Sequence, residues 1–301
     1  PSTIMSLQNI NDPFKSLKFR DLVLRFIILS LITSFVLFFL QANVCFKLNQ
    51  QDSVIIIYSI QFVLLCLWTV KDFGRLKAKA KHVVGDLPQN YNWLRLTWLV
   101  PLIIIFSISC SIILFYLLSL AAPSFLEQLL RSVADTPSVD NSNSFASNLL
   151  VIVTFCLVAP VTEEFLFRGI ILQRWATKWG ICTGLISSSL LFGFVHPNPI
   201  GLSLAGMIWG VLYIKTRSLV VPIAFHALNN IVAVLPQLLP ADSSNSKSTL
   251  TIQNLQSFWW IGVVMMVFSL PLLLRFIWKN WPNKNTIIPY LNNANKEKRA
   301  V

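Results

Sequence analysis

The chain has 301 residues, of which 55% are hydrophobic and only 12% charged. Soluble domains carry about twice that charged fraction, so the composition excludes an ordinary soluble protein. The formal net charge of +12 would suit a nucleic-acid partner, but the basic residues fall between apolar runs instead of forming one face. Because the apolar runs are continuous rather than alternating as in a barrel, we predict an all-α, polytopic membrane protein. We expect membrane lipids as partners and no nucleic acid.

Eight apolar runs are long enough to be candidate membrane spans. They cover residues 22–40, 53–70, 96–122, 147–175, 181–197, 199–214, 219–239 and 257–278. Residues 1–21 are polar and basic and predict a cytoplasmic N-terminal tail. The run that follows has no small-residue cleavage site, so we expect it to be a retained span. We therefore predict a bundle of about eight helices over 22–280 and a mobile, polar, cytoplasmic C-terminal tail over 281–301.

The Lys and Arg residues lie mostly on one of the two sides that alternate spans define. Only Lys47, Arg131 and Lys247 of the 24 basic residues fall on the other side. By the positive-inside rule this asymmetry predicts that both termini are cytoplasmic. The opposite loops, 123–146 and 240–256, are rich in loop-forming residues and predict flexible connections.

The sequence Glu163-Glu164, with Arg168 one turn later, interrupts the fourth apolar run. Ionisable residues inside a membrane are costly and are by default candidates for a functional site. Glu164 and Arg168 can pair at i,i+4, whereas Glu163 points to another face and has no basic neighbour there. A structural Glu–Arg pair between helices would explain two of these residues but not Glu163. Pro160 should also free the carbonyl of Cys156 and leave room for a water.

Two of the three histidines lie inside apolar runs. His196 ends the fifth run, and His226 lies in the seventh, one turn before Asn230 on the same helical face. The third, His82, belongs to the basic loop, where we expect it to be solvated. A lone buried histidine is usually a packing residue, but this set near two glutamates indicates a site.

A depth estimate brings the fourth and fifth runs together. Glu163 lies 17 residues before Gly180, and His196 lies 16 residues after it. If the two runs form a hairpin that turns at Gly180, both side chains lie about 24 Å from the turn. The two side chains can therefore meet.

These residue types suit hydrolysis. A carboxylate beside an imidazole can hold a water and take its proton. A second imidazole with a carboxamide can stabilise an oxyanion. The chain has neither GxSxG nor HExxH, so an activated water is the simplest nucleophile. Glu163, His196 and His226 could equally hold zinc with one open position. The five scattered cysteines, without a CxxC pair, are typical of packing residues.

Three motifs in this order resemble those of a known family. They are the Glu-Glu-x-x-x-Arg motif at 163–168, the Phe-x-x-x-His motif at 192–196 and the His-x-x-x-Asn motif at 226–230. The set resembles the CPBP family, the CAAX-protease and bacteriocin-processing membrane proteins also called Abi. The resemblance covers about residues 147–235. It implies an eight-helix intramembrane endopeptidase whose cavity admits a peptide or protein substrate from the cytoplasm.

The resemblance also implies roles for individual residues. Glu163 would be the general base, assisted by His196, and His226 with Asn230 would form the oxyanion hole. Three residues would support the site: Glu164, Arg168 and Phe192. Zinc stays open as a cofactor. Some relatives act without proteolysis, so a membrane regulator or bacteriocin immunity factor of the same fold is the alternative.

Overall fold

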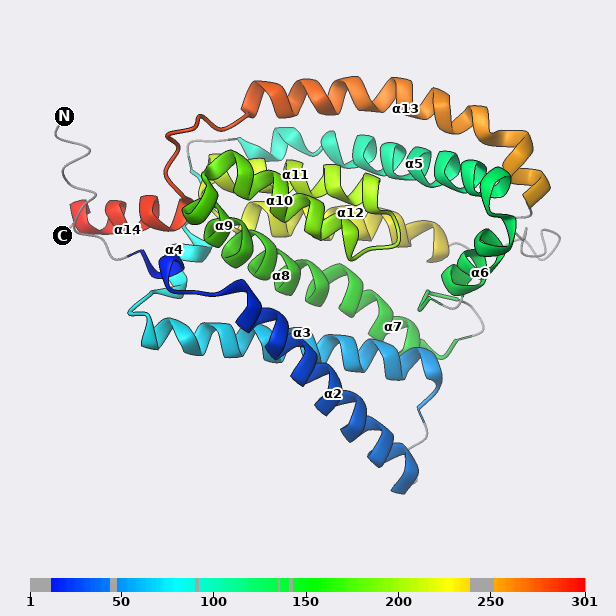
Figure 1. Cartoon of the computed structure of the whole chain (residues 1–301), viewed down its shortest axis with the longest axis horizontal. Helices are drawn as coiled ribbons and strands as arrows, with labels where there is room; N and C mark the ends of the chain where they lie inside the picture. Colours follow the sequence, from blue (N-terminus) through cyan, green and yellow to red (C-terminus); the bar gives the residue numbers. More distant parts are fainter. Residues whose placement is uncertain are drawn as a thin grey trace.

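The computed structural model describes residues 12–43, 48–89, 92–134, 136–140, 143–238 and 252–300. All regular elements in this part of the chain are helices, which confirms the all-α prediction. Figure 1 shows long helices running side by side along one axis, as in a membrane bundle. Seven helical stretches among the described residues are long and apolar enough to cross a membrane. The protein is therefore a multi-pass integral membrane protein.

Six of these seven stretches contain one long helix each. They are α2 (Phe19–Asn43), α3 (Gln50–Arg75), α5 (Leu99–Ala121), α11 (Pro199–Thr216), α12 (Val220–Val234) and α13 (Ile252–Asn280). The seventh, the fourth in chain order, is a continuous helical stretch of changing type. It consists of α7 (Phe145–Val153), η4 (Thr154–Val158), α8 (Ala159–Glu164), η5 (Phe165–Leu172) and α9 (Gln173–Trp179). The remaining elements are η2 (Pro13–Lys15), α4 (Ala80–Val84), η3 (Trp93–Leu96), α6 (Pro123–Ala134), α10 (Ile181–Phe194), η6 (Leu235–Leu238) and α14 (Pro289–Ala300).

Helix α10 is shorter than the span expected at 181–197. It has 14 residues, fewer than the roughly 20 that a membrane-crossing helix needs. The described part of the chain thus has seven candidate spans of full length and one shorter apolar helix, α10. The turn between α10 and α11 reaches only to the middle of α5, where the Asn198 amide donates to the Ser107 carbonyl at 2.7 Å and to the Ser111 hydroxyl at 3.1 Å. These bonds satisfy polar groups that have little access to water.

Helix α2 leaves the bundle. Its main packing partner is α3, and its far end diverges from the other helices (Figure 1). The pair is held by an ion pair between Arg25 and Asp72 and by a hydrogen bond from Gln61 to Ser30. The remaining long helices pack closely, with α13 along α5 and α10 along α11. The bundle therefore has an open side between α2 and its main body.

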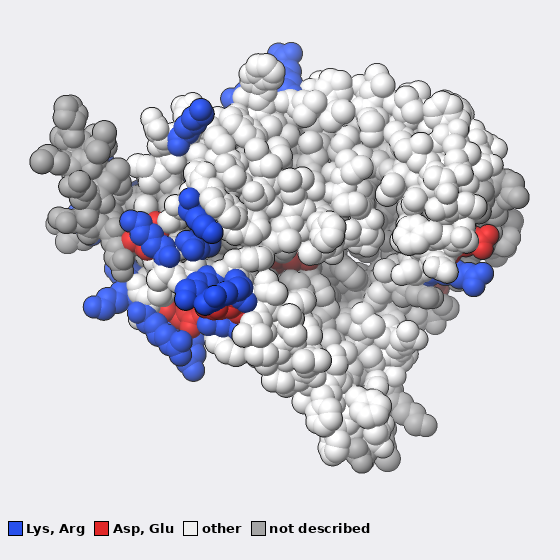
Figure 2. Space-filling model, in the orientation of Figure 1, with Lys and Arg blue, Asp and Glu red and all other residues white. Residues whose placement is uncertain are grey.

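One end of the molecule is basic. Figure 2 shows most of the visible Lys and Arg side chains at the end where α4 and α14 lie, next to a broad uncharged middle. The Lys and Arg residues thus gather at one end of the bundle, as the sequence predicted. That this end faces the cytoplasm stays a prediction.

The C-terminal segment expected to be mobile contains a docked helix. Helix α14 packs on α4, and its Asn293 amide donates to the carbonyls of His82 and Arg217, both at 2.9 Å. The backbone N–H of Tyr290 donates to the side chain of Gln173 at 2.7 Å, which connects α14 to the fourth span. The prediction of a mobile tail was wrong for residues 289–300. The side chain of Gln173 and the carbonyls of His82 and Arg217 provide hydrogen-bond partners for α14.

His82 is also not solvated as predicted. It is buried, and its Nε2 contacts the carboxylate of Glu297 on α14. Lys81 and Lys79 donate to the same carboxylate at 2.6 and 3.1 Å. The hydrogen bonds from Lys81, His82 and Lys79 lower the pKa of Glu297 to about 2. Glu297 therefore contacts three basic side chains of the α4 region, those of Lys79, Lys81 and His82.

The loop expected at 123–146 contains helix α6, which was predicted as a flexible connection. One face of this 12-residue helix is apolar, with Leu126 buried, and the other carries Glu127 and Arg131. A helix of this kind lies along a membrane surface rather than across the membrane. The loop expected at 240–256 falls largely outside the described residues.

Candidate active site

Irregular turns of the fourth span set the positions of its functional groups. In η4, a π-helical turn, the N–H of Ala159 bonds to the carbonyl of Thr154, five residues back. The next residue, Pro160, has no N–H, so the same register leaves the carbonyl of Phe155 without its helical donor. The side-chain amide of Asn230 donates to that carbonyl at 2.8 Å. Proline on one span thereby orients the asparagine of another.

The carbonyl that the site uses differs from the predicted one. In the α-helical register expected from the sequence, Pro160 would leave the carbonyl of Cys156 without its donor. The π-helical register shifts the effect by one residue, to Phe155. Such π-helical turns occur often at functional sites, and a second one, η5, directly follows Glu164.

Glu163 is buried, and polar groups from α3, from α12 and from the turn after α10 surround its carboxylate. Its Oε1 accepts a hydrogen bond of 2.5 Å from the hydroxyl of Tyr58 on α3. Its Oε2 lies 3.6 Å from Nε2 of His196 and 3.9 Å from Nε2 of His226. The expectation that Glu163 has no partner was wrong, because the partners lie on other helices. Among the described residues, Oε2 itself has no hydrogen-bond partner.

Glu164 and Arg168 form the predicted ion pair. Nη1 of Arg168 lies 2.9 Å from Oε1 of Glu164, and both side chains are almost inaccessible to solvent, at 1% and 0% exposure. The same Oε1 also lies 2.9 Å from Nδ1 of His226. The guanidinium stacks on the ring of Phe192, with Cζ 4.4 Å from the ring centroid. Glu164 thus joins the supporting cation to one of the two site histidines.

The oxygen partners fix the orientation of both imidazoles. Nδ1 of His196 lies 2.6 Å from the carbonyl of Phe192, which can only accept, so this nitrogen carries a proton. Nδ1 of His226 likewise donates to the ion-paired carboxylate of Glu164. Both rings therefore present Nε2 toward Oε2 of Glu163. The orientation of a functional histidine is commonly set by such a bond at its other nitrogen.

Aromatic rings form the frame around these polar groups. Trp209 stacks on His226, with centroids 4.3 Å apart and an angle of 14° between the planes. Phe192 meets Trp209 and His226 edge-on and lies 4.4 Å from the ring of His196. A Cβ at Gly206 would lie 2.8 Å from Nη2 of Arg168, so only glycine leaves room for the guanidinium at this point. The rings restrict both histidines to one position.

The site opens into a cavity of about 710 Å³. It is lined by apolar side chains of α2 and α3 on one side and by the fourth span, α10, α11 and α12 on the other. It extends from Phe19 near the basic end to Thr136 and Gln237 near the opposite end. Figure 2 shows a hollow between the α2–α3 pair and the rest of the molecule, with an acidic side chain at its floor. The cavity volume suits a short peptide segment together with water.

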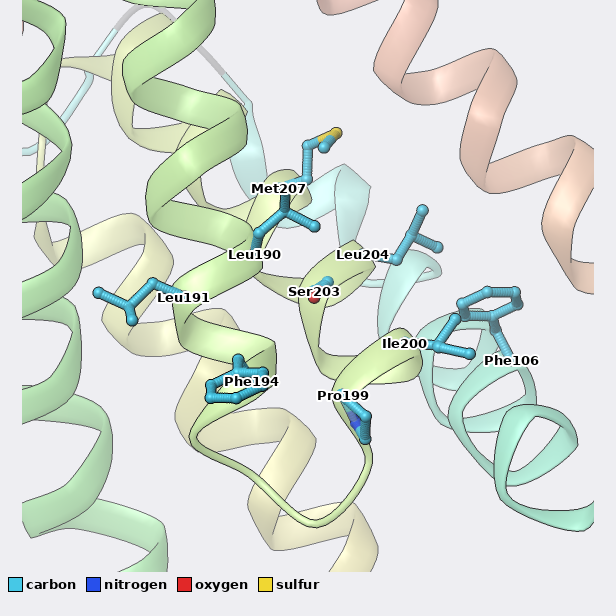
Figure 3. A pocket seen from close by; sticks show the side chains of 9 residues that line it. All are labelled: Phe106, Leu190, Leu191, Phe194, Pro199, Ile200, Ser203, Leu204 and Met207. Atoms are coloured by element: carbon cyan, nitrogen blue, oxygen red, sulfur yellow. The ribbon is translucent and has the colours of Figure 1, made fainter. Parts of the chain in front are cut away.

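A second hollow, of about 740 Å³, lies outside the bundle between α5, α10 and α11 (Figure 3). Phe106, Phe194 and Met207 are among its lining side chains, and no ionisable residue lines it. Because it contains no group able to perform hydrolysis, we assign no catalytic function to it.

The structure brings all the predicted site residues together and adds three that the sequence analysis missed. Tyr58, Trp209 and Asn229 all line the cavity. A tyrosine in the middle of an apolar run was a signal for Tyr58, but nothing in the sequence indicated its partner. Asn229 donates to Oδ1 of Asn230 at 3.3 Å, and its own Oδ1 is buried without a partner in the described part of the chain.

Zinc binding was considered for Glu163, His196 and His226. Within the described residues, no three His, Cys, Asp or Glu side chains have the arrangement of a metal site. The separations of 3.6 and 3.9 Å between the nitrogens and Oε2 exceed a direct hydrogen bond and leave the point that the three atoms face open to a water. Zinc binding stays a prediction, and we derive no step through it.

Comparison with known proteins agrees with the motifs. Residues 145–232 match the family model described as type II CAAX prenyl endopeptidase Rce1-like. The predicted family resemblance is confirmed. The Rce1-like segment includes the fourth span, α10, α11 and most of α12, and therefore all three motifs. Helices α2 and α3, which form one wall of the cavity, lie outside it.

Two curated relatives each match part of the chain. The chain is 34% identical over 94 residues to "Putative membrane peptidase YdiL" of Bacillus subtilis (strain 168), an alignment that covers 30% of this chain and 38% of that protein. It is 34% identical over 86 residues to "Uncharacterized 24.3 kDa protein" of Escherichia coli, covering 26% of this chain and 40% of that protein. The chain thus spans about two fifths of the length of these relatives. No solved structure matches the chain significantly.

Proposed function

We propose that the protein is an intramembrane endopeptidase that hydrolyses a peptide bond with a water activated by Glu163 and His196. The observation that carries this proposal is the convergence on one point of Oε2 of Glu163 and Nε2 of His196 and His226, inside a mainly apolar cavity. The family match to CAAX prenyl endopeptidases supports the same class of reaction. A simple structural ion pair would not require the second glutamate or either imidazole.

The first step is addition of water to the carbonyl carbon. A water between Glu163 and His196 donates one proton to the carboxylate, and its oxygen forms the new bond to carbon. The carbonyl π electrons move to oxygen and form the oxyanion. When the C–N bond breaks, the proton held by Glu163 passes to the leaving nitrogen. The carboxylate is restored, and one water has been consumed.

The position of His226 suits it to stabilise the oxyanion. Its Nδ1 lies 2.9 Å from Oε1 of Glu164, and its Nε2 lies 3.9 Å from Oε2 of Glu163. With Nδ1 directed at Glu164, Nε2 faces the reacting point. In this proposal Nε2 donates a hydrogen bond to the oxyanion.

Asn230 is the second donor in this proposal. The carbonyl of Phe155 and the amide of Asn229 orient its carboxamide. A fixed donor stabilises developing charge without reorganisation during the reaction. Glu164, Arg168 and Phe192 act through His226 and His196, because they hold the two imidazoles rather than line the reacting point.

We further propose that the basic end is cytoplasmic and that the substrate reaches the cavity from that side. The positive-inside rule supports the orientation, and Phe19 extends the cavity toward the basic end. A lipid-bearing C-terminal tail, a signal-peptide remnant and a transmembrane segment all suit a cavity with apolar walls.

Identification of new protein termini in cells tests the function. We expect termini that appear with the unchanged protein and disappear with Glu163→Gln, and we expect the purified protein to cleave a farnesylated CAAX peptide or one of those cellular substrates. Metal analysis of the same preparation, compared with His226→Ala, tests zinc. If the termini are identical with both forms, the protein is a regulator or immunity factor instead.

A further inference from the structure

We propose that Tyr58 is a positioning residue that holds the carboxylate of Glu163 in its reactive orientation. The inference rests on the proposed function and extends the site to a helix outside the Rce1-like segment. Tyr58 lies on α3, whereas the family model matches residues 145–232. The motifs contain no residue with this role, so the chain supplies it from another helix.

The hydrogen bond from Tyr58 gives the two carboxylate oxygens of Glu163 different roles. Oε1 accepts the hydroxyl of Tyr58 at 2.5 Å, whereas Oε2 has no hydrogen-bond partner among the described residues and faces both imidazoles. A glutamate side chain has several accessible rotamers. A bond to one oxygen fixes the plane of the carboxylate and leaves the other oxygen directed at the water.

Helix α3 holds Tyr58 firmly enough for this role. The hydroxyls of Ser59 and Thr154 lie 3.0 Å apart, and the thiol of Cys66 lies 3.7 Å from the carbonyl of Thr162. These two contacts follow Tyr58 in the chain, and before it the hydroxyl of Ser147 on the fourth span donates to the carboxylate of Asp52 on α3 at 2.8 Å. The Tyr58 ring also packs against Phe62, with centroids 4.5 Å apart. The hydroxyl is therefore held by a framework independent of Glu163.

Tyr58→Phe removes a single oxygen atom and keeps the ring. Cleavage of a quenched fluorescent, farnesylated CAAX peptide would be followed with the purified full chain in detergent. We expect kcat to fall about tenfold to a hundredfold, the usual cost of a misplaced catalytic group, with KM and melting temperature unchanged. Unchanged kcat would overturn the proposal. A higher KM with normal kcat would make Tyr58 a substrate-binding residue and would also overturn it.

Ser59→Ala is the matched control. It removes the neighbouring polar contact between α3 and the fourth span without affecting Glu163. We expect it to keep normal kcat, because the contact of Cys66 with Thr162 and the packing of Tyr58 on Phe62 remain and still hold the hydroxyl of Tyr58 in place. An equal loss in both variants would show that Tyr58 merely docks α3, which contradicts a positioning role.

A double-mutant cycle gives a second test that does not depend on one variant. Glu163→Asp shortens the side chain and withdraws the carboxylate from the hydroxyl. In that background, Tyr58→Phe should change kcat by less than about twofold, because coupled neighbours are not additive. Full additivity would overturn the proposal. Failure of the unchanged protein to cleave any peptide would refute the proposed function itself, whereas an active protein with a fully active Tyr58→Phe variant refutes only this inference.

Discussion

The two adjacent glutamates have different surroundings although the sequence presents them as equivalent. Glu164 is fully buried and ion-paired with Arg168, whereas Glu163 lines the cavity and, within the described part of the chain, accepts a hydrogen bond only at Oε1. The carboxylate of Glu164 thus holds Arg168 in place, whereas Oε2 of Glu163 can take a proton from a water. The residues have separate roles because successive helical positions face different directions.

Substitution of each glutamate by glutamine should distinguish these roles. Glu163→Gln should abolish cleavage and keep the melting temperature, because the amide oxygen can still accept from Tyr58. Glu164→Gln should lower stability by about 3–5 kcal/mol, since it leaves a buried cation without its partner. Thermal unfolding in detergent and a cleavage assay measure both effects. An active Glu163→Gln beside a folded but inactive Glu164→Gln would reverse the assignment.

Residue pairs within one helix could be predicted from the sequence, but most pairs between helices could not. The Glu164–Arg168 pair follows from i,i+4 spacing, and the equal depth of Glu163 and His196 follows from helical rise. Tyr58 and Glu163 are 105 residues apart in the chain. No periodicity relates two helices at that distance, so the contact depends on how α3 packs.

At the scale of single elements, Pro160 should act through Asn230 rather than through helix stability. Pro160→Ala returns an N–H to the fourth span, where it can satisfy the Phe155 carbonyl and release the Asn230 amide. We expect kcat to fall, by less than the about 10²- to 10³-fold loss expected for Asn230→Ala, with the melting temperature unchanged or higher. Kinetics and thermal unfolding of the purified variant measure this.

Pro271, inside α13, provides a control for this prediction. Pro271→Ala makes the same change in a helix that contributes no side chain to the cavity. It should leave kcat unchanged. A similar loss in both variants would mean that helix flexibility, rather than Asn230 orientation, limits the reaction.

Docking of α14 should depend on Glu297. Its pKa of about 2 lies below the ordinary value of 4.5, so its contribution is present above that ordinary value and disappears as the pH falls through about 2. Glu297→Gln should mimic the acid form at neutral pH. We expect faster hydrogen exchange in residues 289–300 and 79–85, measured by mass spectrometry.

The ion pair between Lys296 and Asp86 is the comparison for Glu297. Both of its side chains are highly exposed, at 74% and 82%, and exposed pairs contribute little. Asp86→Asn should therefore leave exchange in α14 unchanged. Equal exchange in Glu297→Gln and the unchanged protein would show that the carbonyl bonds of Asn293 hold α14 without Glu297.

Element boundaries show where composition is sufficient and where it is not. Continuous apolar runs predicted the long helices to within a few residues, because burial in lipid requires them. The same runs could not reveal that α10 ends early, since Phe194 and Val195 continue the apolar pattern into the turn. Helix α14 was missed because its polar composition resembles that of a loop, and α6 because the segment 123–146 that contains it is rich in Ser, Asn, Asp and Pro.

At the scale of the whole molecule, orientation can be tested by chemical labelling. In a background with all five cysteines replaced, a cysteine at Lys79 should be shielded from an impermeant thiol reagent in intact cells. A cysteine at Glu127 on α6 should be labelled. Both positions are exposed and lie on opposite sides of the predicted membrane. Labelling at Lys79 and protection at Glu127 would show that the basic end faces outward.

Helix α10 ends at Phe194, after only 14 residues, and this affects how far water must travel through the bilayer to reach the site. At 1.5 Å per residue its 14 residues rise about 21 Å, whereas the hydrocarbon of a bilayer is about 30 Å thick. The turn that carries His196 therefore stops roughly 9 Å short of the far leaflet's headgroups. Neighbouring lipids must shorten or give way to water there, at a modest cost for each ångström of mismatch. We therefore expect the membrane to be thinner beside Glu163, so that water in the headgroup region lies closer to the proposed site than the full bilayer thickness would allow.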